Sequence, residues 1–262
     1  MKKTLLVVCI LTFAAGAHAD FGRKFVKKDN VAAVTKAAKA ATLSDEDMKK
    51  LSLQAVAEMD EQNPVVPDGD PLAQRFDAIV KGLESEDGLA LNFKLYNVSD
   101  VNAFATPDGS IRVMAGLMFI MTDDEVRSVI GHEIGHVKLR HAKKQYQKAY
   151  SVAAGKDAVA ANTGTAGQVL NSSQLGKFIE DVMNAKFSRN DESASDEYGF
   201  KFMVEHGYDY HAMESAFSKL AELSDDSGKK SLKASHPGAA ERAKTAKEWA
   251  DAQDRKMKQA SR

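Results

Sequence analysis

Apolar side chains recur along most of this chain with the three- and four-residue spacing of an α-helix. The segments with this spacing are residues 44–62, 71–85, 122–150, 177–185, 190–206, 211–223 and 238–258. Ser44 is a suitable N-cap for the first of them, and Pro71 stands at a first helical turn, where proline is tolerated. The pattern predicts a mainly helical protein.

One region departs from the helical spacing. Residues 91–98 alternate apolar and polar side chains with period two, which is typical of a strand. In residues 101–116 a Pro-Asp-Gly turn separates two extended segments, as in a hairpin. The predicted fold class is therefore α+β, with one small sheet directly before the long helical segment 122–150.

The first 19 residues have a basic start, an apolar stretch and a small-x-small ending at Ala19. This is the pattern of a secretory signal peptide, and we expect cleavage after Ala19. Cys9 raises the alternative of a lipoprotein, but the Leu-Val-Val before it lacks the small residue expected ahead of a lipidated cysteine. Loss of Cys9 leaves a mature chain without cysteine, which favours a bacterial periplasm.

The rest of the chain predicts an N-terminal arm at residues 20–42 and one domain at 43–262. Residues 152–175, rich in small and polar residues, predict a mobile lid or connector within it. The formal net charge of −1 excludes nucleic acid as an expected partner. The apolar run 111–121 is too short to span a membrane, so membrane contact is expected to be peripheral at most.

The helical segment 122–150 contains the pattern H-E-x-x-H, from His132 to His136. Residues four apart on a helix share a face, so both imidazoles can reach one metal ion. Glu133 lies beside the first histidine, where it can accept a proton from a metal-activated water and return it to a leaving amine. The motif predicts one Zn²⁺ per chain.

A catalytic zinc requires a third protein ligand. The pattern H-E-x-x-H-x-x-G-x-x-H would supply it locally, but Leu139 and Ala142 stand where glycine and histidine are needed. His141 is nine residues from His132 and faces nearly the opposite side of a continuous helix. We therefore expect His141 to lie on the surface and the third ligand to come from another helix.

An acid near the start of the helical segment 190–206 is the best candidate for this ligand. Glu192 and Asp196 are four apart on one face, so Glu192 could ligate the metal while Asp196 orients a ligand histidine. Spacing alone leaves Asp191, Asp196 and Glu197 open as ligands. It also allows that these acids only stabilise a helix N-terminus.

Four stretches together resemble the gluzincin metallopeptidases that include the CAAX prenyl protease and the HtpX-like proteases. The stretches are VIGHEIGH, SRNDESASD, SHPGAAER and the hairpin NAFATPDGSIRVMAGLM. The resemblance covers residues 74–247. Within the family, the sequence is similar to the small periplasmic members without membrane helices, of the LoiP and BepA type. It implies a zincin-like metalloprotease domain with a small β-sheet beside the H-E-x-x-H helix.

The resemblance also implies individual roles. Carried over residue by residue, it gives His132, His136 and Glu192 as the zinc ligands. It also gives Glu133 as the general base and Asp196 as the acid that orients a ligand. Ser195 departs from the alanine that often precedes this aspartate. The family's E-x-x-x-D pattern supports the orienting role of Asp196.

Other matches with the family concern the cleft. His236 and Arg242 match late polar positions near it, and Asn102, Ala103 and Phe104 match the hairpin before the metal helix. His236 could stabilise an oxyanion or complete the zinc coordination at rest, or it could be a loop histidine that caps the last helix. Residues 110–115 could be the sheet edge along which an extended peptide binds.

These features predict a zinc-dependent endopeptidase of the bacterial periplasm that degrades misfolded or unassembled envelope proteins. The expected partners are polypeptide substrates and outer-membrane assembly proteins. The alternative is a zinc-stabilised chaperone or assembly factor with marginal proteolytic activity, which would keep the ligands but depend little on Glu133.

Overall fold

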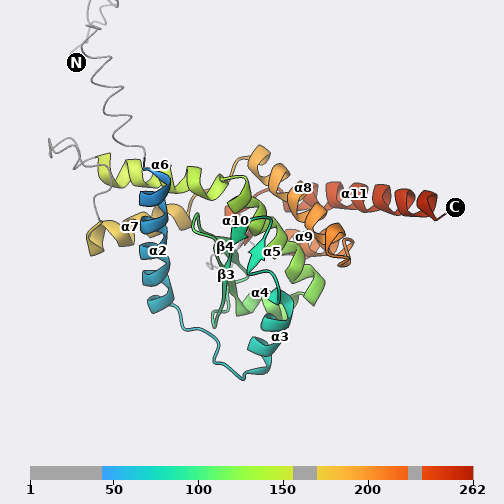
Figure 1. Ribbon diagram of the computed structural model, residues 1–262, viewed down its shortest axis with the longest axis horizontal. Helices are drawn as coiled ribbons and strands as arrows, with labels where there is room; N and C mark the ends of the chain where they lie inside the picture. Colours follow the sequence, from blue (N-terminus) through green and yellow to red (C-terminus); the bar gives the residue numbers. More distant parts are fainter. Residues whose placement is uncertain (1–42, 156–169, 224–231, 262) are drawn as a thin grey trace, which may run out of the picture. The chain divides into compact units, whose positions relative to one another are not determined.

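The computed structural model describes residues 43–155, 170–223 and 232–261, which belong to one compact unit, Thr42–Arg262 (Figure 1). The predicted signal peptide and N-terminal arm, residues 1–42, lie outside the described residues, as do residues 156–169 of the predicted lid or connector. Within the described ranges, no helix combines the length and apolar character that a membrane span needs.

The first described elements are two helices, α2 (Asp45–Gln62) and α3 (Pro71–Val80). The Ser44 side chain accepts a hydrogen bond from the Asp47 N–H, and Asp70 does the same for the Leu72 N–H, so both helix starts are capped. The helix predicted over 71–85 ends earlier, at Val80, because the chain turns into strand structure.

The sheet structure follows these helices. β1 (Ser85–Glu86) and β2 (Leu89–Ala90) form a short antiparallel pair. The larger sheet contains β3 (Asn92–Tyr96), β4 (Ala103–Ala105) and β5 (Ser110–Met114) in the order β3-β5-β4. β5 is parallel to β3 and antiparallel to β4, which confirms the predicted strand and hairpin.

The strand order corrects the predicted substrate edge. Residues 110–115 were expected at the edge, but β5 pairs with a strand on each side and all its side chains are buried. The two outer strands beside β5 are β3 and β4, and the pairing of β4 registers Ala103 with Val113. The hairpin pattern predicts that two strands pair, but it does not show which of them takes β3 as a second neighbour.

The remaining described elements are helical. They are α4 (Ala115–Ile120), α5 (Asp123–Lys138), α6 (His141–Gly155), α7 (Ser172–Met183), α8 (Arg189–Glu205), α9 (Ala212–Glu222), α10 (Leu232–Ser235) and α11 (Ala239–Ala260). α5 packs along α8 and contacts α9, α6 and β4, as Figure 1 shows for its central position. The mainly helical fold with a small sheet beside the H-E-x-x-H helix is thereby confirmed.

The long helix predicted over 122–150 is broken. α5 ends at Lys138, Arg140 adopts a left-handed backbone with φ of 61°, and α6 begins at His141. The Leu139 and Arg140 N–H groups close the last turn by bonding to the Gly135 and Val137 carbonyls. Glycine or asparagine usually marks such an ending, so an arginine there gives no warning in the sequence.

Two hydrophobic clusters hold these elements. The larger one lies between the main sheet, α3, α5, α8, α9 and α11, and the smaller one joins α2, α6 and α7 around Tyr146 and Phe178. α5 is buried along almost its whole length, from Glu125 to Val137. A helix buried on all sides is held by tertiary packing, which gives its side chains fixed positions.

A buried ion pair connects α2 to the sheet. The Arg112 side chain on β5 is 2% exposed, and its Nε lies 2.8 Å from Asp60 Oδ1; Lys94 and Tyr96 also bond to Asp60. Burial alone would raise the pKa of Asp60, but hydrogen bonds from Arg112, Lys94 and Tyr96 outweigh it and lower the pKa to about 2. Asp60 therefore stays charged and anchors α2.

Candidate metal centre

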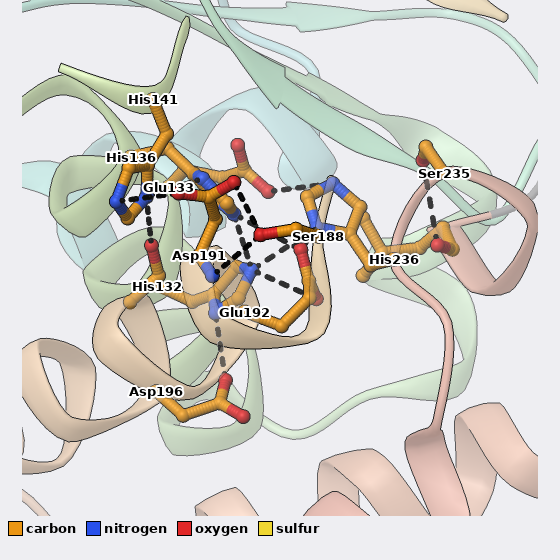
Figure 2. A network of polar contacts seen from close by, with 12 residues as sticks. His132, Glu133, His136, His141, Ser188, Asp191, Glu192, Asp196, Ser235 and His236 are labelled. Carbon is orange, nitrogen blue, oxygen red and sulfur yellow. Dashed lines mark hydrogen bonds and ion pairs between the residues drawn. The ribbon is translucent and has the colours of Figure 1, made fainter. Parts of the chain in front are cut away.

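Four side chains of types that can bind a metal come from three parts of the chain and point toward one another (Figure 2). His132 and His136 come from α5, Glu192 from the first turn of α8, and His236 from the residue after α10. One possible ligand atom from each lies within 4.8 Å of every other. All four are buried, with at most 3% of their surface exposed.

The distances between these atoms suit one metal ion. Nε2 of His132 lies 2.9 Å from His136 Nε2 and 3.1 Å from His236 Nδ1. Oε1 of Glu192 lies 3.4 Å from His136 Nε2 and 2.9 Å from His236 Nδ1. A tetrahedral zinc with ligands at about 2.0–2.1 Å holds its donor atoms about 3.3 Å apart. Three imidazoles and one carboxylate are also a donor set that zinc favours.

Small residues allow α5 and α8 to approach closely enough to build this group. A β-carbon at Gly131 would lie 2.6 Å from the Phe202 ring, and one at Gly135 would lie 3.1 Å from the Ser195 backbone. On the facing helix, a β-carbon at Gly199 would lie 3.0 Å from the backbone nitrogen of His132. The three glycines therefore bring the acids of α8 to the histidines of α5.

Asp196 and Arg242 lie behind His132. Asp196 Oδ1 is 2.7 Å from His132 Nδ1, and two nitrogens of Arg242 bond to the Asp196 carboxylate. Burial would raise the pKa of Asp196, but the Arg242 charge and the hydrogen bond to His132 outweigh it and lower the pKa. Arg242 itself is held over the Phe217 ring at 4.1 Å. A charged Asp196 orients the His132 ring so that Nε2 faces the other donors.

Glu192 is the acid that the fold brings into the donor group. The Ser188 side chain caps the N-terminus of α8, next to Glu192. Arg242 Nη1 lies 2.7 Å from Glu192 Oε2, but the two groups are not aligned for a hydrogen bond. Burial alone would raise the pKa of Glu192, but the charge of His236 and the hydrogen bonds from His136 and His236 hold it far below its usual range. The Glu192 carboxylate is therefore charged, as a metal ligand needs to be.

The other acids that spacing left open lie elsewhere. Asp196 faces the outer nitrogen of His132, and Asp191 is paired with His141 and Lys144. Glu197 is exposed and paired with Lys201 one turn later. Of these four acids, Glu192 alone contributes an oxygen to the group of possible ligand atoms.

His236 reaches the group from the segment between α10 and α11. Its Nδ1 lies among the donors, and its Nε2 is 3.6 Å from Glu133 Oε1. Burial lowers the pKa of His236, but the Glu192 and Glu133 carboxylates outweigh it and raise the pKa. His236 does not cap the last helix, because the N-cap of α11 is Gly238 and no side chain bonds there.

Glu133 lies beside the four donors but is not one of them. It is 1% exposed, and its Oε1 has no hydrogen-bond partner among the described residues. It lines a cavity of about 30 Å³ together with His236 and the predicted cleft residues Asn102, Ala103 and Phe104. The cavity can hold a water molecule, for which about 10–15 Å³ suffices. It is too small for a peptide.

Comparison with known proteins decides the family. The model of peptidase family M48 matches residues 73–250, more than half of the chain. The chain belongs to peptidase family M48. It is similar to the metalloprotease YcaL of Escherichia coli (strain K12), with 38% identity over 93% of this chain and 96% of that protein. The metalloprotease LoiP of the same strain is 40% identical over 78% of this chain and 81% of its own.

A more distant relative is the beta-barrel assembly-enhancing protease of Yersinia pestis, which is 28% identical over 51% of this chain and 29% of its own length. The family and the two E. coli relatives show that this M48 protein is a metallopeptidase. The predicted resemblance and the predicted enzyme class are thereby confirmed.

The structure places two residues differently from their predicted positions. Arg242 is not among the described residues that line the cavity; it lies behind the metal group, paired with Glu192 and Asp196. His141 was expected on the surface, and that prediction is wrong, because the residue is 5% exposed. The break before α6 removes the continuous helix on which the surface prediction depended, and it directs His141 toward the M48 metal group.

Phe187 was not predicted as part of this site. Its ring stacks on His136 at 3.8 Å between centroids with an interplanar angle of 26°, and it lies 5.1 Å from the His236 ring. Phe187 therefore covers one face of a metal-group histidine and helps to close the cavity. A lone phenylalanine before a helix carries no sequence signal for this position.

Proposed function

We propose that this M48 metallopeptidase is a zinc endopeptidase in which His132, His136 and Glu192 bind the metal. The observation that carries the proposal is the buried group of three imidazoles and one carboxylate beside a Glu133 oxygen that has no hydrogen-bond partner among the described residues. His236, whose Nδ1 lies among the donors, would complete the coordination at rest. Since a catalytic zinc needs one open position, His236 would leave the group when substrate binds.

The bound zinc would supply Lewis-acid polarisation of the scissile carbonyl and acidify a water molecule. Glu133 Oε1 would accept the proton of the attacking water and carry it to the leaving amine nitrogen. Asp196 would hold the His132 ring, and Arg242 would keep Asp196 charged while it lies beside the Glu192 carboxylate. His236, with Nε2 beside Glu133, would be placed to stabilise the developing oxyanion once it has moved.

A substrate backbone would bind along β4, the sheet edge on the side of the cavity. Ala103 and Phe104 of this strand line the cavity with Glu133, and Asn102 directly precedes them. An extended peptide added to a sheet edge is held by main-chain hydrogen bonds, which are independent of its sequence. Such binding suits unfolded polypeptides, because a folded chain does not offer a free extended segment.

Removing the metal should abolish cleavage reversibly. We expect casein, a disordered substrate, to be cleaved by the protein with about one bound zinc per chain, and the rate to fall below detection after dialysis against a zinc chelator. Adding about one equivalent of Zn²⁺ should restore the rate. The measurement is fluorescent-casein release, with zinc determined by mass spectrometry and folding by circular dichroism. Undiminished cleavage by folded, zinc-free protein would exclude the proposal.

We further propose that the protein acts in the bacterial periplasm on misfolded or unassembled envelope proteins. The export pattern of residues 1–19 supports the location. The Yersinia relative is named for enhancing beta-barrel assembly, which supports outer-membrane assembly proteins as partners.

The location predicts a defined mature N-terminus. Protein recovered from a periplasmic extract should have the mass of a chain that begins at Asp20, without an acyl group, because the signal pattern ends at Ala19. Intact-protein mass spectrometry measures this. A chain that retains residues 1–19 in the cytoplasmic fraction, or one acylated at Cys9, would contradict it.

A further inference from the structure

His136 has a partner on the ring nitrogen that faces away from the metal group. Its Nε2 lies among the donor atoms, while its Nδ1 lies 3.2 Å from Nδ1 of His141 (Figure 2). The two rings are nearly perpendicular, with an interplanar angle of 70° and centroids 5.2 Å apart. This contact joins α5 to the first residue of α6 across the break at Arg140.

His141 is held in turn by groups from α8. Its Nε2 lies 3.2 Å from Asp191 Oδ1, and the Ser195 hydroxyl lies 3.1 Å from its Nδ1. Asp191 is one-quarter exposed and also lies 3.6 Å from the Lys144 ammonium. The buried imidazole of His141 is therefore fixed at both nitrogens.

One placement of protons fits the contacts that lead from His136 through His141 to Asp191. If Nε2 of His136 binds a metal, its Nδ1 carries the proton and must donate it in a hydrogen bond. Nδ1 of His141 is then the acceptor, so the proton of a neutral His141 is on Nε2, where Asp191 can accept its hydrogen bond. In this arrangement both imidazoles are neutral, and the Asp191 carboxylate is the charged group at the end of the contacts from His136 through His141.

We propose that His141 is a positioning residue that fixes the ring orientation and tautomer of His136 for metal binding, and that Asp191 holds His141. The inference rests on the proposed metal site. The other α5 histidine, His132, contacts the Asp196 carboxylate directly, whereas His136 reaches its carboxylate through a second imidazole. Outer partners of this kind typically contribute about 10–100-fold to metal affinity.

The test compares zinc affinity in variants that differ in their hydrogen-bonding atoms. His141→Phe keeps a ring but removes the acceptor, and His141→Asn places an amide oxygen near the position of Nδ1. His211→Phe is the matched control, because His211 is also paired with an aspartate, Asp254, at 3.2 Å but lies outside the site. Zinc dissociation constants are measured by competition with a chromogenic chelator, and apo-protein folding by circular dichroism.

We expect His141→Phe to weaken zinc binding about 10–100-fold with an unchanged apo spectrum. His141→Asn should recover most of this loss, and His211→Phe should bind as the wild type does. The visible absorption bands of the Co²⁺-loaded protein should shift in His141→Phe and lie near the wild-type positions in the other two. Wild-type affinity in His141→Phe, or equal losses in the phenylalanine and asparagine variants, would overturn the proposal.

Asp191→Ala provides the second test if His141→Phe does not fold. It removes the acceptor for His141 Nε2 from a partly exposed position, and the Ser188 cap bonds to the backbone nitrogen of residue 191, which remains. We expect weaker zinc binding than in the wild type; unchanged affinity and an unchanged Co²⁺ spectrum would overturn the proposal. If the wild type itself binds no zinc, the proposed metal site fails, which is a distinct result from failure of the His141 contact.

Discussion

Replacing Glu133 by glutamine should lower kcat/KM for casein cleavage by about 10²- to 10⁴-fold, the range typical of a lost general base. Glutamine has nearly the same shape but cannot accept the proton of the attacking water. Glu133 contributes no atom to the group of possible ligands, so zinc should stay bound at about one per chain. The measurements are initial cleavage rates and zinc content on the same preparation.

Asp124→Asn is a suitable control for this variant. Asp124 lies on the same helix, but it is one-third exposed and paired with Arg127, so its loss should leave cleavage unchanged. Wild-type cleavage by Glu133→Gln would contradict the assigned mechanism. If Glu133→Gln loses cleavage but rescues a deletion strain as well as the wild type does, the chaperone or assembly hypothesis is favoured instead.

Replacing Glu192 by glutamine should remove both metal and activity. Glu192 supplies the single carboxylate of the donor group, and a neutral amide is a much poorer zinc ligand. We expect zinc affinity to fall by more than about 100-fold, which exceeds the loss expected for a residue that only hydrogen-bonds to a ligand, such as His141. Cleavage should fall with it. Competition with a chromogenic chelator measures the affinity, and casein release measures the activity.

Glu197→Gln is the matched control, because Glu197 lies on the same helix but is exposed and paired with Lys201. It should retain zinc and full cleavage. Circular dichroism of Glu192→Gln is needed because Arg242 loses one of its two buried carboxylate partners. A folded Glu192→Gln with one zinc per chain would show that another residue provides the third ligand.

The sequence alone was sufficient for the features that depend on local spacing. Four-residue spacing on a helix is a property of the backbone, so His132 and His136 had to share a face once residues around them were helical. The same spacing related Glu192 to Asp196, and the period-two stretch and the Pro-Asp-Gly turn predicted the strands that are observed. Family resemblance then narrowed four possible acids to Glu192.

Local spacing could not predict contacts that depend on how distant segments pack. β5 takes the centre of the sheet because β3, from an earlier segment, pairs with it, and strand order is not contained in the alternation of side chains. The approach of α8 to α5 depends on Gly131, Gly135 and Gly199 meeting across the interface. Each of these glycines, taken singly, would only lower the expected helix stability.

His141 shows the difference most directly. Its sequence position predicted a surface residue because a continuous helix was expected through Arg140. The left-handed turn at Arg140 instead reverses that expectation and places His141 between His136 and Asp191. Sequence spacing thus determined the two histidines at the centre, and family resemblance selected the acid that meets them. Tertiary packing decided the groups around them, because a backbone break and helix contacts direct those side chains.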